Sequence, residues 1–466
     1  MNKIKRFLET AGIYLIGSVL SKLIGFFLLP LYTGKLPPDQ FGMYDLVTTV
    51  ISLSVPVVFF QIWDGMFRFA FEKHNPNEKY SVVSSSFLVW ASGLVIYSIV
   101  FLMMCKALRF EFTWLIYLYG IAVAVQYQYV YIARAFLRNK LFVMSGLINS
   151  LLSAITNIVL ILMFNIGIES LYIAPILGCI AQILMIEIVL QPLKHLHLHD
   201  IKVHKIMEML RFSLPLCIAT ILYWLLSGYT KIAISQQLGT YSNGLYAVAN
   251  RFSSVMMLLI TVFQYAWNEM AYLMAKDDNR AAKYEKSVEY IFKIVLLGSG
   301  VFMLFIKIIF PYIINSAYRD ALMIVPLSLI GVAVNAFAGF IDTIFMAEKQ
   351  TRWIFMTTVI GAGINIVALW IFTPIWGLQG AIGALCFAFT VLALFRIYVL
   401  GKIFAIKLHW SNFLYILMLA AVVWVFYAVN NTLWLVLVII FLSGVSVYSL
   451  HDILISLLRG IIKDRR

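Results

Sequence analysis

The sequence has little charge and no long polar stretch. Asp, Glu, Lys and Arg make up 12% of its 466 residues, whereas a soluble globular protein carries roughly 25% because its surface must be hydrated. No segment between the hydrophobic runs is long enough to fold as a separate soluble domain. The composition therefore excludes a soluble protein, and it indicates an integral membrane protein over the whole length.

Motifs that carry chemistry are also lacking. The four cysteines are scattered and form no C-x-x-C pair, which argues against a thiol redox site. No G-x-x-x-x-G-K-[ST], G-x-S-x-G or H-E-x-x-H pattern is present. His195, His197 and His199 alternate with other residues, which is not the spacing of helical metal ligands. We therefore expect no catalytic residue, no cofactor and no metal, and a protein that is not an enzyme.

Long hydrophobic runs dominate what is present. Each run is long enough to cross about 30 Å of hydrocarbon as a helix. We therefore predict an all-α polytopic membrane protein with about fourteen transmembrane helices. The predicted helices are 11–33, 43–70, 82–105, 112–134, 143–165, 169–190, 212–238, 244–272, 288–309, 320–346, 353–373, 378–400, 411–429 and 433–455.

The distribution of basic residues indicates which loops lie on the cytosolic side of the membrane. The formal net charge is +14, but the Lys and Arg residues lie in alternate loops and not on a soluble nucleic-acid-binding face. An N-terminus on the cytosolic side places about 25 of the 35 Lys and Arg residues on that side. We expect a multi-pass protein with both termini in the cytoplasm and no nucleic-acid partner.

The two halves of the chain resemble one another. The turn 36–47 after the first predicted helix shares Leu, Gly and Tyr, at the same spacing, with the turn 238–248 after the seventh. Asn157-Ile158-Val159 in the fifth helix corresponds to Asn365-Ile366-Val367 in the eleventh, and a turn with a glycine follows each. Because six helices per copy is an even number, the copies are parallel repeats.

This repeat predicts four segments. Residues 1–190 form an N-lobe of six helices, and 191–211 form a cytosolic loop between the lobes. Residues 212–400 form a C-lobe of six helices, and 401–466 add two extra helices and a cytosolic tail.

Several basic residues fall inside the predicted helices, where a charged side chain costs roughly 2.5–3.5 kcal/mol on insertion scales. For Lys22 and Arg251 we favour a functional role, because no acidic residue lies within a helical turn of either. Lys231 lies near the external part of its helix. A cavity between the halves could receive Lys22 and Arg251, and two separated cations suit phosphate or pyrophosphate. Lys293 and Lys307, near the ends of helix 288–309, can reach the interface.

The acidic residues inside the helices leave alternatives open. Asp64 and Arg68 are four residues apart on one face, so they can form an ion pair that steadies the bundle or a ligand or gating site. Asp342 is a second candidate for an ion pair or an ion-coupling site. The predicted helix 112–134 is rich in tyrosine, including Tyr127 and Tyr129, which we interpret as an interfacial belt.

At this point the residues resemble a known family. Ser21-Lys22-Leu23-Ile24-Gly25-Phe26, Pro30-Leu31-Tyr32-Thr33 and the turn from Leu36 to Tyr44 resemble the opening of Wzx-type polysaccharide flippases. These flippases belong to the multidrug/oligosaccharidyl-lipid/polysaccharide (MOP) exporter superfamily. The resemblance implies two six-helix lobes around a central cavity, together with the two extra C-terminal helices.

The resemblance also implies a site. The family commonly places basic residues of helices one, two, seven and eight toward the cavity, and Lys22, Arg68, Lys231 and Arg251 are the matching positions. Many relatives have an Asp-Arg pair late in helix seven, where this chain has Thr230-Lys231.

The implied function is a flippase of the bacterial cytoplasmic membrane. It would move an isoprenoid-pyrophosphate-linked oligosaccharide from the inner to the outer leaflet by alternating access, for surface polysaccharide synthesis. Its expected partners are that substrate, the membrane lipids and other polysaccharide-assembly proteins. The alternatives are a flippase of the lipid-linked peptidoglycan precursor, or a drug or cation antiporter of the same superfamily. Such an antiporter would be expected to carry a carboxylate in helix one, where Lys22 lies.

Overall fold

The computed structural model describes residues 19–108, 112–196, 201–406, 412–449 and 451, with side chains left out at 104–108. The chain folds into two compact units, Met1–Trp224 and Leu225–Arg466. In the described residues every regular element is helical. This is expected of apolar spans, because in lipid a helix satisfies all of its backbone hydrogen bonds within one segment.

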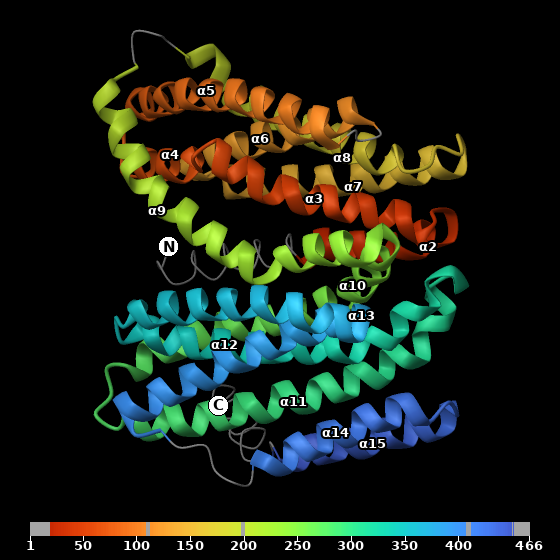
Figure 1. The fold of residues 1–466 in the computed structure, drawn as a ribbon. Coiled ribbons are helices and arrows are strands. Elements are labelled where there is room, and N and C mark those ends of the chain that lie inside the picture. The colour runs from red at the N-terminus through yellow and green to blue at the C-terminus, as the bar shows by residue number, and fades with distance from the viewer. Residues whose placement is uncertain (1–18, 109–111, 197–200, 407–411, 450, 452–466) are drawn as a thin grey trace, which may run out of the picture. The chain divides into compact units, whose positions relative to one another are not determined.

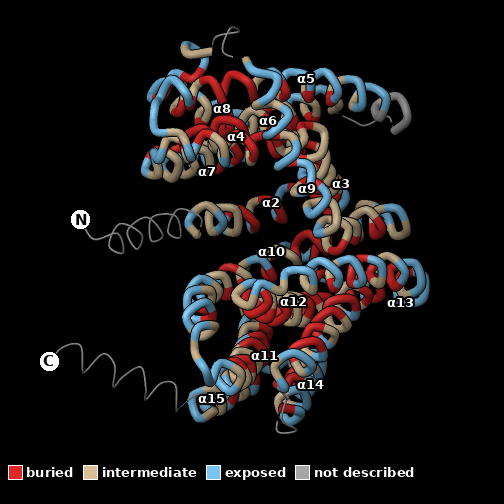
Figure 2. The backbone as a smooth tube through the Cα atoms, turned by 90° about the vertical axis from the view of Figure 1, so that its left-hand side faces the viewer, coloured by how far each residue is buried: buried red, intermediate tan, exposed pale blue. Residues whose placement is uncertain are grey.

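The central helices of the first unit are α8 and α4 (Figures 1 and 2). α8 packs against α6 and α7, and α4 packs against α5 and α6. Trp63, Phe59 and Tyr172 are fully buried in the core of this unit, and Figure 2 shows buried stretches along α4 and α8. The elements of the unit are the described helical residues 19–27, α2 (Leu29–Lys35), α3 (Pro38–Val58), α4 (Ile62–Phe71), α5 (Pro76–Leu108), α6 (Thr113–Ala135), α7 (Asn139–Leu162), α8 (Ser170–Leu190), the 3-10 turn η1 (Pro192–His195) and most of α9 (Val203–Ser227).

The second unit is centred on α12, which packs against α10, α11 and α13. α14 and α15 both pack on α11 (Figure 1). The elements of this unit are α10 (Tyr229–Met274), α11 (Arg280–Ile313), the 3-10 segment η3 (Ser316–Ile324), α12 (Val325–Ala347), α13 (Thr351–Phe404), α14 (Asn412–Ala428) and α15 (Thr432–Ser449).

The predicted number of crossings is confirmed. In the described residues, eleven helices are long and apolar enough to span a membrane. α13 supplies two crossings because it divides at Gly377, and α14 and the segment 19–35 add the last two. A straight helix of the 54 residues of α13 would be about 80 Å long, far more than a bilayer needs. The division into lobes at 191–211 stays a prediction.

Two helices break where the repeat predicts turns. Gly239 in α10 has φ 83° and ψ 170°, and Gly377 in α13 has φ 58° and ψ −137°. Only glycine occupies these backbone regions readily. The chain therefore breaks within the predicted turn regions. The glycines that the two halves share at the first turn are Gly42 and Gly244, which are helical, and Gly239 corresponds to Pro37 of the first half.

Two further breaks were not predicted. The predicted helix 43–70 divides into α3 and α4 because Phe60 and Gln61 both adopt left-handed conformations, with φ 53° and 48°. The predicted helix 212–238 is interrupted at Gly228, between α9 and α10. Gly228 keeps helical angles, with φ −76° and ψ −34°, so only the break at Phe60 and Gln61 has non-helical backbone. Such backbone at membrane depth is tolerated where it is buried in protein or lines a polar cavity, and this break therefore points to the residues beside it.

Gly377→Ala is expected to lower the stability of the protein. A Cβ at Gly377 would meet no atom within 4 Å, so the loss comes from backbone strain alone, about 1–3 kcal/mol. The measurement is the melting temperature of purified protein in detergent. Gly383→Ala is the matched control, since Gly383 also lies in α13 with open space around it and has no positive φ. Equal melting temperatures for the two variants would contradict the assignment.

Candidate functional site

The predicted cations of the first unit have different surroundings. Lys22 lies in the helical segment 19–27 with an exposed side chain. Arg68 lies one turn from the end of α4 and forms its ion pair with Glu72, four residues further on, rather than with Asp64. Both members of that pair are half exposed, and exposed i,i+4 pairs stabilise only weakly. The charge of Arg68 is therefore balanced by Glu72, whereas Lys22 has no ion pair among the described residues.

Asp64 faces α6 instead of Arg68. Its carboxylate interacts with the side chains of Gln61 and Tyr131 and lies in the field of Arg134. Gln61, at the break between α3 and α4, also accepts a hydrogen bond from Thr220 of α9 at 3.0 Å. Asp64 Oδ2 is buried without a hydrogen-bond partner in the described residues. The break thus places a carboxylate with spare acceptor capacity among polar and aromatic side chains.

Tyr127 and Tyr129 of α6 lie inside the unit and not in an interfacial belt. Tyr127 stacks on Trp63 with ring centroids 4.8 Å apart. Tyr129 is buried, and its hydroxyl donates to Glu187 Oε2 at 2.9 Å. The belt interpretation was wrong for these two residues because α6 packs against α4 and α8, so its faces are turned into the unit.

The predicted cations of the second unit flank the turn at Gly239. Lys231 precedes the turn by about 12 Å of helix and Arg251 follows it by about 18 Å, at 1.5 Å per residue. Both side chains are half buried. They therefore lie well inside the apolar length of their helices, where a cation needs a partner or an aqueous cavity.

The break beside Lys231 is braced by the repeated asparagine. Asn365 of α13 is fully buried, and its Nδ2 donates to Leu226 O at 3.0 Å and to Thr230 Oγ1 at 3.2 Å. The first of these bonds satisfies a carbonyl that ends a helix at the interruption. Asn365 thus fixes the backbone from which Lys231 projects.

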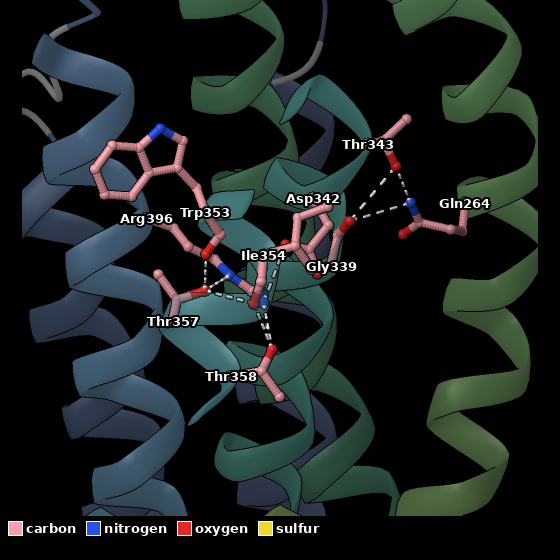
Figure 3. A network of polar contacts seen from close by, with 9 residues as sticks. All are labelled: Gln264, Gly339, Asp342, Thr343, Trp353, Ile354, Thr357, Thr358 and Arg396. Carbon is pink, nitrogen blue, oxygen red and sulfur yellow. Dashed lines mark hydrogen bonds and ion pairs between the residues drawn. The ribbon is translucent and has the colours of Figure 1, made fainter. Parts of the chain in front are cut away.

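The second unit also contains a buried ion pair (Figure 3). Arg396 Nη2 lies 3.0 Å from Asp342 Oδ1, with 4% and 19% of the two side chains exposed. Arg396 also donates through Nε to Thr357 Oγ1 at 3.1 Å and through Nη2 to Thr358 Oγ1 at 3.4 Å. The guanidinium, which projects from the second half of α13, is thereby tied to α12 and to the first half of α13.

Sequence reasoning missed Arg396. It lies four residues before the predicted helix end at 400, a position that normally indicates an interfacial residue. A usable signal existed, because the tenth and twelfth predicted helices run in the same direction. Asp342 and Arg396 are opposite charges at similar distances from ends that lie on the same side of the membrane.

An amide and hydroxyl cluster continues from this pair along α12. Gln264 Nε2 of α10 donates to Thr343 Oγ1 at 2.8 Å and to Asn268 Oδ1 at 3.1 Å. Thr343 Oγ1 donates in turn to Asn268 Oδ1 at 2.9 Å. Figure 3 shows Gln264 and Thr343 meeting between α10 and α12. Such bonds hold membrane helices together at about 0.6 kcal/mol each, so we assign the cluster to packing.

The two remaining lysines inside helix 288–309 are bound within the protein and do not need the interface. Lys293 Nζ pairs with Glu289 Oε1 at 2.7 Å. Lys307 Nζ donates to Phe426 O and, at 2.6 Å, to Val429 O, at the end of α14. Lys307 therefore caps α14 from α11, a role that is invisible in the local sequence because 122 residues separate it from Val429.

Comparison with solved structures identifies the fold. The fold is similar to an inward-facing MATE family transporter of the MOP superfamily, with a TM-score of 0.68 and 13% identity, covering 83% of this chain and 98% of that one. It is similar to lipid II flippase MurJ in an inward closed conformation, with a TM-score of 0.68 and 16% identity, covering 94% and 99%. An outward-facing MATE structure matches with a TM-score of 0.56 and 14% identity, covering 86% and 96%. The chain therefore has the transporter fold of this superfamily.

The sequence itself identifies the family. The model of the polysaccharide biosynthesis protein family matches residues 7–268, more than half of the chain, and the chain belongs to that family. A comparison with curated proteins found no significant match. The resemblance inferred from the opening motif is confirmed at the level of family and fold.

Proposed function

We propose that the protein is a flippase that moves an isoprenoid-pyrophosphate-linked oligosaccharide from the inner to the outer leaflet of the bacterial cytoplasmic membrane. The family concerns polysaccharide biosynthesis, and the fold is shared with a flippase of a lipid-linked precursor. The observation that carries the proposal is the set of cations inside apolar spans, Lys22 in the first unit and Lys231 and Arg251 in the second. Cations in such positions suit a diphosphate that must leave water.

The predicted site residues differ in whether a neighbouring group already balances their charge. Lys22, Lys231 and Arg251 would attract the pyrophosphate, whereas Arg68 would contribute less because Glu72 already balances its charge. Of the two carboxyls proposed for ion coupling, Asp64 is better placed. The charge of Asp342 is balanced by Arg396, while Asp64 keeps an unpartnered oxygen.

Alternating access is the proposed mechanism. Solved members of the superfamily with this fold include inward-facing and outward-facing conformations. The distribution of Lys and Arg supports cytosolic termini, so the sugar would load from the cytosol. Other polysaccharide-assembly proteins are the partners that a flippase of this kind would have.

The test is transport by the purified protein alone. Proteoliposomes would receive a pyrophosphate-linked oligosaccharide, lipid II or a labelled cationic drug, and movement across the bilayer would be measured for each. We expect movement of the pyrophosphate-linked oligosaccharide and none of the drug. Lipid II moving in its place would favour the peptidoglycan-precursor alternative, for which the likeness to MurJ is the supporting observation. Movement of the drug alone would overturn the proposal.

A further inference from the structure

A basic pocket lies in the first unit, away from the residues proposed to bind substrate. Its volume is about 470 Å³, within the usual range of small-molecule sites. The ends of four helices form its walls, namely the first turn of α5, the end of α8 and the connection from α6 to α7. The polar and aromatic side chains of its lining are His74, Lys79, Tyr80, Phe136 and Arg138.

Two of these side chains hold the walls in place. Lys79 is 8% exposed, and its Nζ donates to Ala135 O at 2.8 Å, at the end of α6, and lies 5.4 Å above the ring of Phe136. Tyr80 donates through its hydroxyl to Leu190 O at 2.9 Å, at the end of α8. The ring of Tyr80 stacks on His195 with centroids 4.1 Å apart. Lys79 and Tyr80 are thus fixed in position within the lining.

The basic side chains of the pocket keep donors for a further ligand. The Lys79 ammonium has three donors, of which one is bound to Ala135 O. Arg138 adds a full charge from the start of α7. No Asp or Glu is among the described lining residues of the pocket. The pocket is therefore suited to an anion with several acceptor oxygens.

The rim of the pocket is apolar. Val189 and Leu137 line it and are 53% and 47% exposed, and Leu193, in the turn after α8, is 53% exposed. All these residues lie at the helix ends that the Lys and Arg distribution predicts to face the cytosol. A charged recess with an apolar edge at that level matches a phospholipid, whose phosphate enters the recess while its chains remain in the bilayer.

We propose that this pocket binds the phosphate of an anionic phospholipid of the cytosolic leaflet. Basic pockets between transmembrane helices on that side are a known means of holding anionic headgroups. The inference does not rest on the proposed function, because it concerns a lipid that stays bound at one end of the first unit. The bound lipid bridges the ends of α5, α6, α7 and α8.

The test is native mass spectrometry of the full chain in a neutral detergent, titrated with phosphatidylglycerol or phosphatidylcholine. We expect a tight phosphatidylglycerol site and only weak, unsaturated binding of phosphatidylcholine. Arg138→Gln leaves the hydrogen bonds of Lys79 and Tyr80 in place, and it should weaken the tight site about fivefold, the value of one charge near a lipid surface. Lys140→Gln is the matched control, since Lys140 is an exposed charge two residues away that does not line the pocket.

The outcomes separate the sources of the phosphate. Equal weakening by Arg138→Gln and Lys140→Gln would mean general surface attraction and would overturn the proposal. Equal binding of the two lipids would overturn it as well. Displacement of phosphatidylglycerol by an equal concentration of inorganic phosphate would assign the pocket to a free anion. Retention of the lipid in inorganic phosphate, together with about fivefold weaker binding in Arg138→Gln but not in Lys140→Gln, supports the proposed site.

Discussion

Replacing Arg251 by glutamine is expected to lower transport of the pyrophosphate-linked oligosaccharide at least tenfold in proteoliposomes. Arg251 is half buried on α10, about 18 Å of helix from the turn at Gly239. A hydrogen bond to a charged group contributes about 1.5–3 kcal/mol, and each 1.4 kcal/mol corresponds to a factor of ten. Lys22→Gln should act in the same direction, because Lys22 is the cation of the first unit that is proposed to attract the pyrophosphate.

The design separates loss of function from loss of fold. Lys276→Gln removes an exposed charge from the loop between α10 and α11 and should leave transport within twofold of the unaltered protein. All three variants should reach the same level in the membrane and melt at the same temperature. Normal transport by both Arg251→Gln and Lys22→Gln would remove the cations from the proposed site. A lower melting temperature for Arg251→Gln would mean that the residue steadies the fold.

The architecture follows closely from the sequence because membrane insertion leaves few alternatives. Apolar runs must become helices to satisfy their own backbone, so the number of crossings could be counted in advance. The turns at Gly239 and Gly377 could be located because the halves repeat them and their backbone conformations admit only glycine readily.

The helix breaks and the ion-pair partners of the charged residues could not be predicted from the sequence. Phe60 and Gln61 adopt left-handed conformations that neither residue type favours, so nothing local indicates a break there. The spacing suggested Asp64 as the partner of Arg68, but Arg68 pairs with Glu72 because Asp64 is turned toward α6. Lys307 meets its acceptors more than a hundred residues away. Such choices depend on helix packing, which a single sequence does not contain.

Asp342→Asn is expected to destabilise the protein more than any of the other single substitutions proposed. It leaves the guanidinium of Arg396 inside the second unit without its counter-charge, and breaking a buried pair in this way costs about 3–5 kcal/mol. Arg396→Met should cost less. A carboxyl without its partner can take up a proton, whereas a guanidinium cannot lose one. The measurement is the melting temperature of each variant in detergent, together with its level in the membrane.

The double variant Asp342→Leu with Arg396→Met tests whether the two charges stabilise the protein through their mutual interaction. Thr357 and Thr358 keep their bonds without Arg396, since Thr357 Oγ1 donates to Trp353 O and Thr358 Oγ1 to Ile354 O, each at 2.7 Å. Replacing both charges by apolar groups of similar size is often neutral or stabilising. We therefore expect the double variant to melt near the unaltered protein and above Asp342→Asn. Destabilisation equal to the sum of the two single substitutions would show that the charges act independently. A stable double variant that transports normally would also exclude Asp342 from ion coupling, leaving Asp64 as the carboxyl to test.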